Sequence, residues 1–164
     1  MPTDTVYGIH GVAPETMHEL RALKGRDGRK PFLLLMPDLA AVERYLSAEV
    51  PRDLAQGWPG ALTLVLAAPA GGTVAIRVPR PPWLRAVLRD VERPLFSTSA
   101  NPPGVAPARS GREVAAWFGR RIDLIVDDGV VGYSPPSTLV DATVSPPRVL
   151  RHGAVAVGPV GNGR

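Results

Sequence analysis

The feature that most restricts the fold of this chain is the brevity of its apolar segments, which alternate with stretches of helical spacing. Residues 62–67 and 73–78 are two such segments, and the Pro-Ala-Gly-Gly stretch between them suits the turn of a β-hairpin. Short strands that alternate with amphipathic helices pack as a sheet covered by helices. We therefore expect an α+β fold of the three-layer α/β type, with a twisted mixed sheet flanked by helices.

The spacing of apolar residues places the individual elements. It predicts helices over residues 15–24, 39–46, 51–58, 82–90 and 113–118. It predicts strands over residues 31–36, 62–67, 73–78, 94–97, 122–126, 137–141 and 148–150. No internal repeat and no linker rich in Gly and Ser divides the chain, so we expect one domain over residues 1–153 and a flexible C-terminal tail over residues 154–164.

Composition excludes several classes of protein. The 164 residues include no cysteine, which excludes disulfides, thiolate metal sites and a cysteine nucleophile. The apolar runs are far shorter than the roughly 20 residues that span a bilayer, and no signal peptide precedes them. We therefore expect a cytoplasmic protein with no membrane partner.

The net charge of +4 and the pI of about 10.1 are compatible with an anionic partner or with a simple excess of surface arginine. Only Lys24 and Lys30 among the basic residues are lysines, and both lie in one short segment. A compact ammonium differs from a planar guanidinium in the contacts it makes, so this pair is a candidate for a specific role.

Four polar segments lie at the edges of predicted strands or helices, where loops of such sheets build binding sites. They cover residues 2–8, 24–31, 97–101 and 136–141, the last with 150–153 after it. The second segment holds four cations and two glycines in its first seven residues, which suits either a solvated loop or the binding of a triphosphate.

Several familiar sites are missing from the sequence. It has no phosphate-binding loop of the GxxxxGK[ST] type, no GxGxxG fingerprint and no GxSxG elbow. The three histidines, at positions 10, 18 and 152, lack the spacing of metal ligands and suit surface or loop positions. We predict no metal site built from side chains, and no residue stands out as a general base.

Seven motifs, in order along the chain, resemble the YrdC-like family of threonylcarbamoyl-AMP synthases. They are PTDTVYG at 2–8, KGRxxxKP at 24–31, WPGxLTL at 58–64, VAIRVP at 74–79, SxSAN at 97–101, STxVD at 137–141 and LRxG at 150–153. Each motif alone is weak evidence, but seven in the right order are specific.

The resemblance implies a reaction in which ATP, L-threonine and bicarbonate give L-threonylcarbamoyladenylate and pyrophosphate for tRNA modification. The residues implied for L-threonine are Thr5, Arg77, Ser97 and Ser137. Those implied for ATP are Lys24, Arg26, Lys30, Thr73, Ser99 and Arg151. Magnesium is expected to arrive bound to the nucleotide, and the implied partners are RNA and other tRNA-modification proteins.

The sequence itself indicates that Arg77 has an anionic partner. Arg77 lies in an otherwise apolar strand, where an unpaired guanidinium would be costly to bury. A substrate carboxylate would pair with it, and so would an aspartate in a purely structural ion pair.

The resemblance also shows a departure at the start of the chain. In the family a helix and a strand precede the PTDT motif, so we expect the natural protein to start upstream of Met1. Without such support, we expect the segment 2–8 to be poorly held. The alternatives to the enzyme are an RNA-binding module of the same fold, a truncated inactive copy, and the related domain of hydrogenase-maturation carbamoyltransferases.

Overall fold

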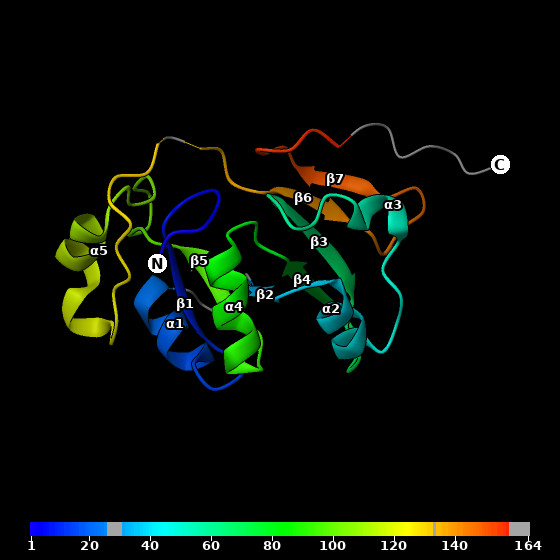
Figure 1. Ribbon diagram of the computed structural model, residues 1–164, viewed down its shortest axis with the longest axis horizontal. Helices are drawn as coiled ribbons and strands as arrows, with labels where there is room; N and C mark the ends of the chain where they lie inside the picture. Colours follow the sequence, from blue (N-terminus) through cyan, green and yellow to red (C-terminus); the bar gives the residue numbers. More distant parts are fainter. Residues whose placement is uncertain (26–30, 133, 158–164) are drawn as a thin grey trace.

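The computed structural model describes residues 1–25, 31–132 and 134–157, and these residues form one seven-stranded sheet with helices around it (Figure 1). The strands are β1 (Gly8–Val12), β2 (Leu33–Leu35), β3 (Leu62–Ala67), β4 (Thr73–Arg77), β5 (Leu95–Ser99), β6 (Thr138–Asp141) and β7 (Arg148–Arg151). The helices are α1 (Met17–Lys24), α2 (Leu39–Leu46), α3 (Arg52–Ala55), α4 (Pro82–Val91) and α5 (Gly111–Phe118), followed by the 3-10 turn η1 (Gly119–Arg121).

The sheet is mixed, as the sequence predicted. Its strand order is β1-β5-β2-β4-β3-β6-β7, with parallel pairs β2–β4 and β3–β6 and antiparallel pairs elsewhere. The predicted hairpin is confirmed as the antiparallel pair β3–β4. The order brings the ends of strands that are far apart in sequence next to one another, which is what a site built from separate loops requires.

Both faces of the sheet are covered by apolar side chains. Leu34 of β2 belongs to a large core cluster, whereas its neighbour Leu35 belongs to a smaller one. Successive residues of a strand point to opposite faces, so these two clusters lie on opposite sides of the sheet. Leu84 and Leu88 of α4 pack in the smaller cluster, and α1 and α5 contribute to the larger one.

The termini of α2 follow the physical signals in the sequence. The Asp38 side chain accepts a hydrogen bond from the Ala41 backbone N–H, which caps the helix. At the other end, Ser47 adopts a positive φ of 53°. Val42 and Leu46, which lie four residues apart, face the core.

Two of the expected elements differ from the structure, and one strand was not expected. Residues 122–126 form no strand, because this apolar segment lies beside β1 without joining the sheet, and its Leu124 side chain is 75% exposed. The helix predicted over 51–58 is shortened to α3, since Trp58 and Pro59 lead into the next strand. The strand β1 was not predicted, because its two glycines and its histidine lack the pattern of a strand.

The opening segment is held more firmly than expected. Met1 and Gly8 exchange two backbone hydrogen bonds of 3.0 and 2.9 Å, and Pro2 pairs with Tyr7 as an antiparallel bridge. Between them the Thr3 N–H donates to the Val6 carbonyl at 3.1 Å. The segment therefore forms a closed turn that leads directly into β1.

The tail predicted over residues 154–164 falls partly outside the described residues, which end at 157. Within them, Ala154 donates its N–H to the Pro136 carbonyl, and the Val155 carbonyl accepts from the Thr138 hydroxyl. No helix among the described residues is long and apolar enough to cross a membrane.

Candidate functional site

Arg77, at the end of β4, is a deeply buried cation that donates hydrogen bonds to three protein oxygens. Its side chain is 4% exposed. Nε donates to the Gly60 carbonyl at 3.0 Å, Nη1 to the Thr5 hydroxyl at 3.0 Å, and Nη2 to Asp4 Oδ1 at 2.5 Å. Burial lowers the pKa of Arg77 and the Asp4 carboxylate opposes that shift. The sequence left open whether Arg77 pairs with a ligand or an aspartate, and in this structure Asp4 is its anionic partner.

A second guanidinium, that of Arg151 in β7, lies near the first. Arg151 donates from Nη2 to the Ser137 carbonyl at 2.8 Å and from Nε to the same oxygen at 3.2 Å. Burial is the largest cause of the lowered pKa of Arg77. Asp4 raises this pKa, and the positive charge of Arg151 lowers it further. Two cations that repel one another favour an anion between or beside them.

Ser137 connects Arg151 to Thr63 of β3. The hydroxyls of Ser137 and Thr63 are 2.7 Å apart, and Arg151 Nη2 also lies 3.3 Å from the Ser137 hydroxyl. Ser137 is 3% exposed and Thr63 is 1% exposed. These hydroxyls are therefore fixed in a buried position at the start of β6, where parallel strands β3 and β6 begin.

The end of β5 carries the second group of predicted residues. Lys24 is 6% exposed and donates from Nζ to the Ser99 carbonyl at 2.9 Å and to the Asn101 carbonyl at 2.5 Å. It also lies 3.1 Å from Asn101 Oδ1, which accepts from the Ser99 hydroxyl at 2.5 Å. Lys24 thus donates to three oxygens of the loop that follows β5 and organises this loop.

The sheet register relates the two groups. Ser97 lies opposite Leu33 and Arg77 lies opposite Leu35. Because alternate residues of a strand share a face, Ser97 and Arg77 lie on the same face of the sheet, the one that α4 covers. Thr73 is four residues before Arg77 in β4, so it lies on the same face, at the exposed opposite end of the strand.

Only some of the ten predicted site residues contact one another in the described part of the chain. Thr5 contacts Arg77, and Ser137 contacts Arg151, which lies near Arg77. Lys24 contacts Ser99, while Ser97 and Thr73 share a face with Arg77 without a direct contact to it. Arg26 and Lys30 lie outside the described residues.

Sequence reasoning missed three residues at this site: Asp4, Gly60 and Thr63. Asp4 stands between Thr3 and Thr5 in the polar opening segment, and that position was the available signal for it. Thr63 is in a strand that is otherwise apolar, where a threonine is an ordinary strand residue. Gly60 contributes a backbone carbonyl, which any residue carries.

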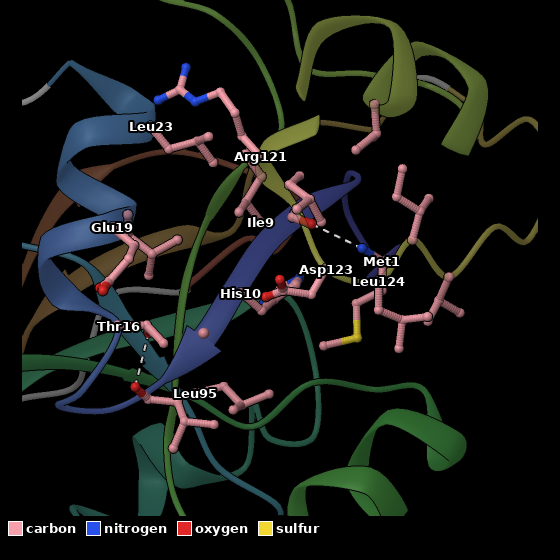
Figure 2. A pocket seen from close by; sticks show the side chains of 18 residues that line it. Met1, Ile9, His10, Thr16, Glu19, Leu23, Leu95, Arg121, Asp123 and Leu124 are labelled. Atoms are coloured by element: carbon pink, nitrogen blue, oxygen red, sulfur yellow. Dashed lines mark hydrogen bonds between the residues drawn. The ribbon is translucent and has the colours of Figure 1, made fainter. Parts of the chain in front are cut away.

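A separate hollow of about 440 Å³ lies beside β1, between α1 and residues 121–126 (Figure 2). None of the ten predicted residues lines it. His10 borders it, with both ring nitrogens buried and without a hydrogen-bond partner among the described residues. Burial lowers the pKa of His10 to about 3, so this histidine is neutral and is not the surface residue that the sequence suggested.

The described residues contain no group of three His, Cys, Asp or Glu side chains that could hold a metal ion. The hydrogen-bonding groups near Arg77 are instead hydroxyls, carbonyls and guanidinium donors. Such a set is suited to a small ligand that carries a carboxylate and further polar groups.

Comparison with known proteins identifies the family. The Sua5/YciO/YrdC family, which carries the description "Telomere recombination", matches residues 1–153. The chain belongs to this family. It is 36% identical over 155 residues to a protein of Halorhodospira halophila named threonylcarbamoyl-AMP synthase, a match that covers 85% of this chain and 81% of the relative.

Solved structures of Sua5/YciO/YrdC proteins have the same fold. Pyrococcus abyssi Sua5, in a crystal structure of its complex with L-threonine, is 32% identical and superposes with a TM-score of 0.83. The match covers 93% of this chain and 49% of that protein. Escherichia coli YciO is 25% identical with a TM-score of 0.80, over 93% of this chain and 81% of that one. The predicted fold class and family resemblance are both confirmed.

Proposed function

We propose that this Sua5/YciO/YrdC chain is an L-threonylcarbamoyladenylate synthase, a nucleotidyltransferase that converts ATP, L-threonine and bicarbonate into threonylcarbamoyl-AMP and pyrophosphate. The observation that carries the proposal is the buried Arg77, which is held by Thr5 and Asp4 close to a second guanidinium. The names of the relatives and the threonine complex of the Pyrococcus abyssi protein support the same reaction.

L-threonine is assigned to the inner part of the site. Its carboxylate pairs with Arg77, and the hydroxyls of Thr5, Ser97 and Ser137 surround the rest of the molecule. All four of these residues are at most 8% exposed, so the amino acid would be largely removed from water. Charge-assisted hydrogen bonds are strongest in such an environment.

ATP is assigned to the outer part of the site. Arg151, Ser99 and Thr73 are the described residues that would contact it, with Lys24 supporting the loop that carries Ser99. Arg26 and Lys30 complete the set of cations for the triphosphate. We expect magnesium to arrive bound to the phosphate oxygens of ATP.

The chemistry needs positioning and charge neutralisation more than acid–base catalysis. The threonine amine reacts with carbon dioxide from bicarbonate and gives a carbamate with release of a proton. A carbamate oxygen then attacks the α-phosphorus, its new P–O bond replacing the bond to the departing pyrophosphate. Both reactants are anions, so guanidinium and ammonium groups that bring them together lower the barrier.

The product would serve the formation of threonylcarbamoyladenosine in tRNA. We therefore expect the protein to act in the cytoplasm, together with other tRNA-modification proteins. Its net charge of +4 is compatible with contact to RNA.

The proposal is tested by incubating the protein with ATP, L-threonine and labelled bicarbonate and isolating the adenylate. Label should enter the adenylate only when all three substrates are present. Arg26→Ala and Arg151→Ala should each reduce incorporation at least about tenfold, because each removes a charge-assisted contact to phosphate. Arg52→Ala is the matched control, since the Arg52 side chain is 68% exposed. Incorporation that does not depend on threonine would contradict the proposal.

A further inference from the structure

Both members of the Arg77–Asp4 pair have hydrogen-bonding groups that are not used within the described residues. A guanidinium has five N–H donors, and the hydrogen bonds of Arg77 to Gly60, Thr5 and Asp4 occupy three of them. Two donors on the terminal nitrogens thus have no partner among the described residues. Asp4 uses Oδ1 on Arg77, whereas its Oδ2 is buried and has no hydrogen-bond partner among the described residues.

A buried carboxylate oxygen without a partner is costly. Native structures satisfy nearly all such atoms with protein, water or a ligand. The environment of Asp4 favours a cationic donor, since Arg77 is the one cation paired with this carboxylate in the described part of the chain and the second carboxylate oxygen is a strong acceptor. The missing group is therefore a donor that comes from outside the described residues.

A free α-amino acid has the complementary arrangement of charges. It carries a carboxylate and an ammonium on one carbon atom, side by side, just as Arg77 and Asp4 present a guanidinium and a carboxylate in contact at 2.5 Å. The two spare N–H donors of Arg77 suit a carboxylate, and the free Oδ2 of Asp4 suits an ammonium. Neither charge of the ligand would then be buried unpaired.

We propose that Asp4 is the residue that recognises the α-ammonium group of the amino-acid substrate, accepting its hydrogen bond on Oδ2 while Arg77 binds the α-carboxylate. This inference rests on the proposed function and adds a specificity-determining residue to it. Asp4 would make the site select α-amino acids over carboxylic acids of the same shape.

Asp4 lies on the turn formed by residues 2–7, so binding is coupled to the position of this turn. The turn is closed by the Thr3 contacts to Val6 and anchored to the sheet face by the Thr5 and Asp4 contacts to Arg77. Since Arg77 and Asp4 Oδ2 are both buried, the turn must move outward to admit a ligand and then return.

A competing role for Asp4 would give the opposite effect on affinity. If Asp4 merely occupied Arg77 in the absence of substrate, the ligand carboxylate would have to displace it. Replacing Asp4 would then tighten ligand binding. In our proposal the same replacement weakens the binding of ligands that carry an ammonium and spares those that do not.

The test compares two ligands by calorimetry at pH 7: L-threonine and its 2-hydroxy analogue, in which a hydroxyl replaces the amine. The wild-type protein should bind threonine about 10- to 100-fold more tightly than the analogue, the range expected for one charge-assisted hydrogen bond. In Asp4→Asn this preference should fall to about threefold or less. Asp90→Asn, an acid-to-amide change at an exposed position of α4, should keep the wild-type preference.

The other possible results of this comparison would overturn the proposed role of Asp4. Equal weakening of both ligands in Asp4→Asn would indicate a merely structural residue, and tighter threonine binding would indicate a competitor; either overturns the proposal. If Asp4→Asn does not fold, a crystal structure of the wild-type protein with L-threonine decides, with the amine within about 3.2 Å of Asp4 Oδ2 as the expected result. An amine bonded elsewhere would overturn it. Failure of the wild-type protein to bind threonine at all would instead contradict the proposed function.

Discussion

Tyr7 and Asp127 are joined by a hydrogen bond of 2.8 Å across 120 residues of sequence. Tyr7 is fully buried, and its hydroxyl also lies 2.8 Å from the Gly129 carbonyl and accepts from the Asp128 N–H at 3.0 Å. Tyr7 is the last residue of the turn that holds Asp4 and Thr5, so this contact fixes one end of the turn against the loop after α5. The opening segment is therefore supported by a distant part of the chain.

Replacing Tyr7 by Phe should lower the free energy of unfolding by about 1 kcal/mol, because the buried hydroxyl makes several contacts that a phenyl ring cannot make. Chemical denaturation monitored by circular dichroism measures this change. Tyr45→Phe, at an exposed tyrosine of α2, is the control and should leave the unfolding midpoint unchanged.

The hydrogen bond between Tyr7 and Asp127 should also make the free energy of unfolding depend on pH. The Tyr7 hydrogen bond, followed by the Gly111 N–H, lowers the pKa of Asp127. A carboxyl group with a lowered pKa in the folded protein stabilises it above its ordinary pKa of about 3.9 and loses that effect as pH falls through the lowered value. Stability of the wild-type protein should therefore decline below about pH 4, and Tyr7→Phe should show a shallower decline. Parallel curves for the two proteins would contradict this role of the hydrogen bond.

His10 should add a second pH dependence at higher pH. Its pKa is lowered by burial to about 3, while a histidine in the unfolded chain titrates near 6.5. Between these values the unfolded chain binds more protons, so stability falls as pH decreases, by up to about 1.4 kcal/mol per pH unit. His10→Asn should flatten the stability curve between about pH 6 and pH 4. His18→Asn is the control, at an exposed position of α1.

Lys24→Met should loosen the loop that follows β5. The change removes the ammonium donor from the Ser99 carbonyl and from Asn101, and leaves these acceptors in a partly buried environment. We expect a loss of about 2 kcal/mol in the free energy of unfolding and a raised KM for ATP, because Ser99 would no longer be held in place. An unchanged KM would indicate that the loop does not contact the nucleotide.

Arg77→Met should be strongly destabilising, by about 3 kcal/mol or more, because it leaves the Asp4 carboxylate buried without a cation. The double variant Asp4→Asn with Arg77→Met should recover part of this loss, since both charges are then absent. Thermal denaturation of the three variants measures the coupling. Additive effects of the two single changes would contradict a direct ion pair.

The sequence predicted most of the sheet because its strands are apolar and separated by turn residues. The hairpin β3–β4 and the helix α2 depend on local signals of this kind, and both are confirmed. The segment 122–126 has the composition of a strand, but it lies beside the edge strand β1 without pairing to it, and local sequence does not report whether a segment pairs. The strand β1 shows the reverse, since Gly8 and Gly11 pair with β5 despite a low strand propensity.

Predictions for the site were most successful where a burial argument existed. Arg77 was singled out because a guanidinium in an apolar strand needs an anion, and the structure places Asp4 there. The sequence could not choose between an aspartate and a ligand, because that choice depends on how the opening turn folds over the sheet. The assignment of the ten residues to ATP and threonine stays a prediction, and its triphosphate part depends on Arg26 and Lys30, which lie outside the described residues.

Release of pyrophosphate from ATP tests the central claim most directly, measured with and without L-threonine and bicarbonate. The wild-type protein and Arg52→Met should release pyrophosphate only when both other substrates are present, and Arg77→Met should release almost none under conditions in which it is folded. Pyrophosphate release that is independent of threonine, or that persists at the wild-type rate in folded Arg77→Met, would contradict the account.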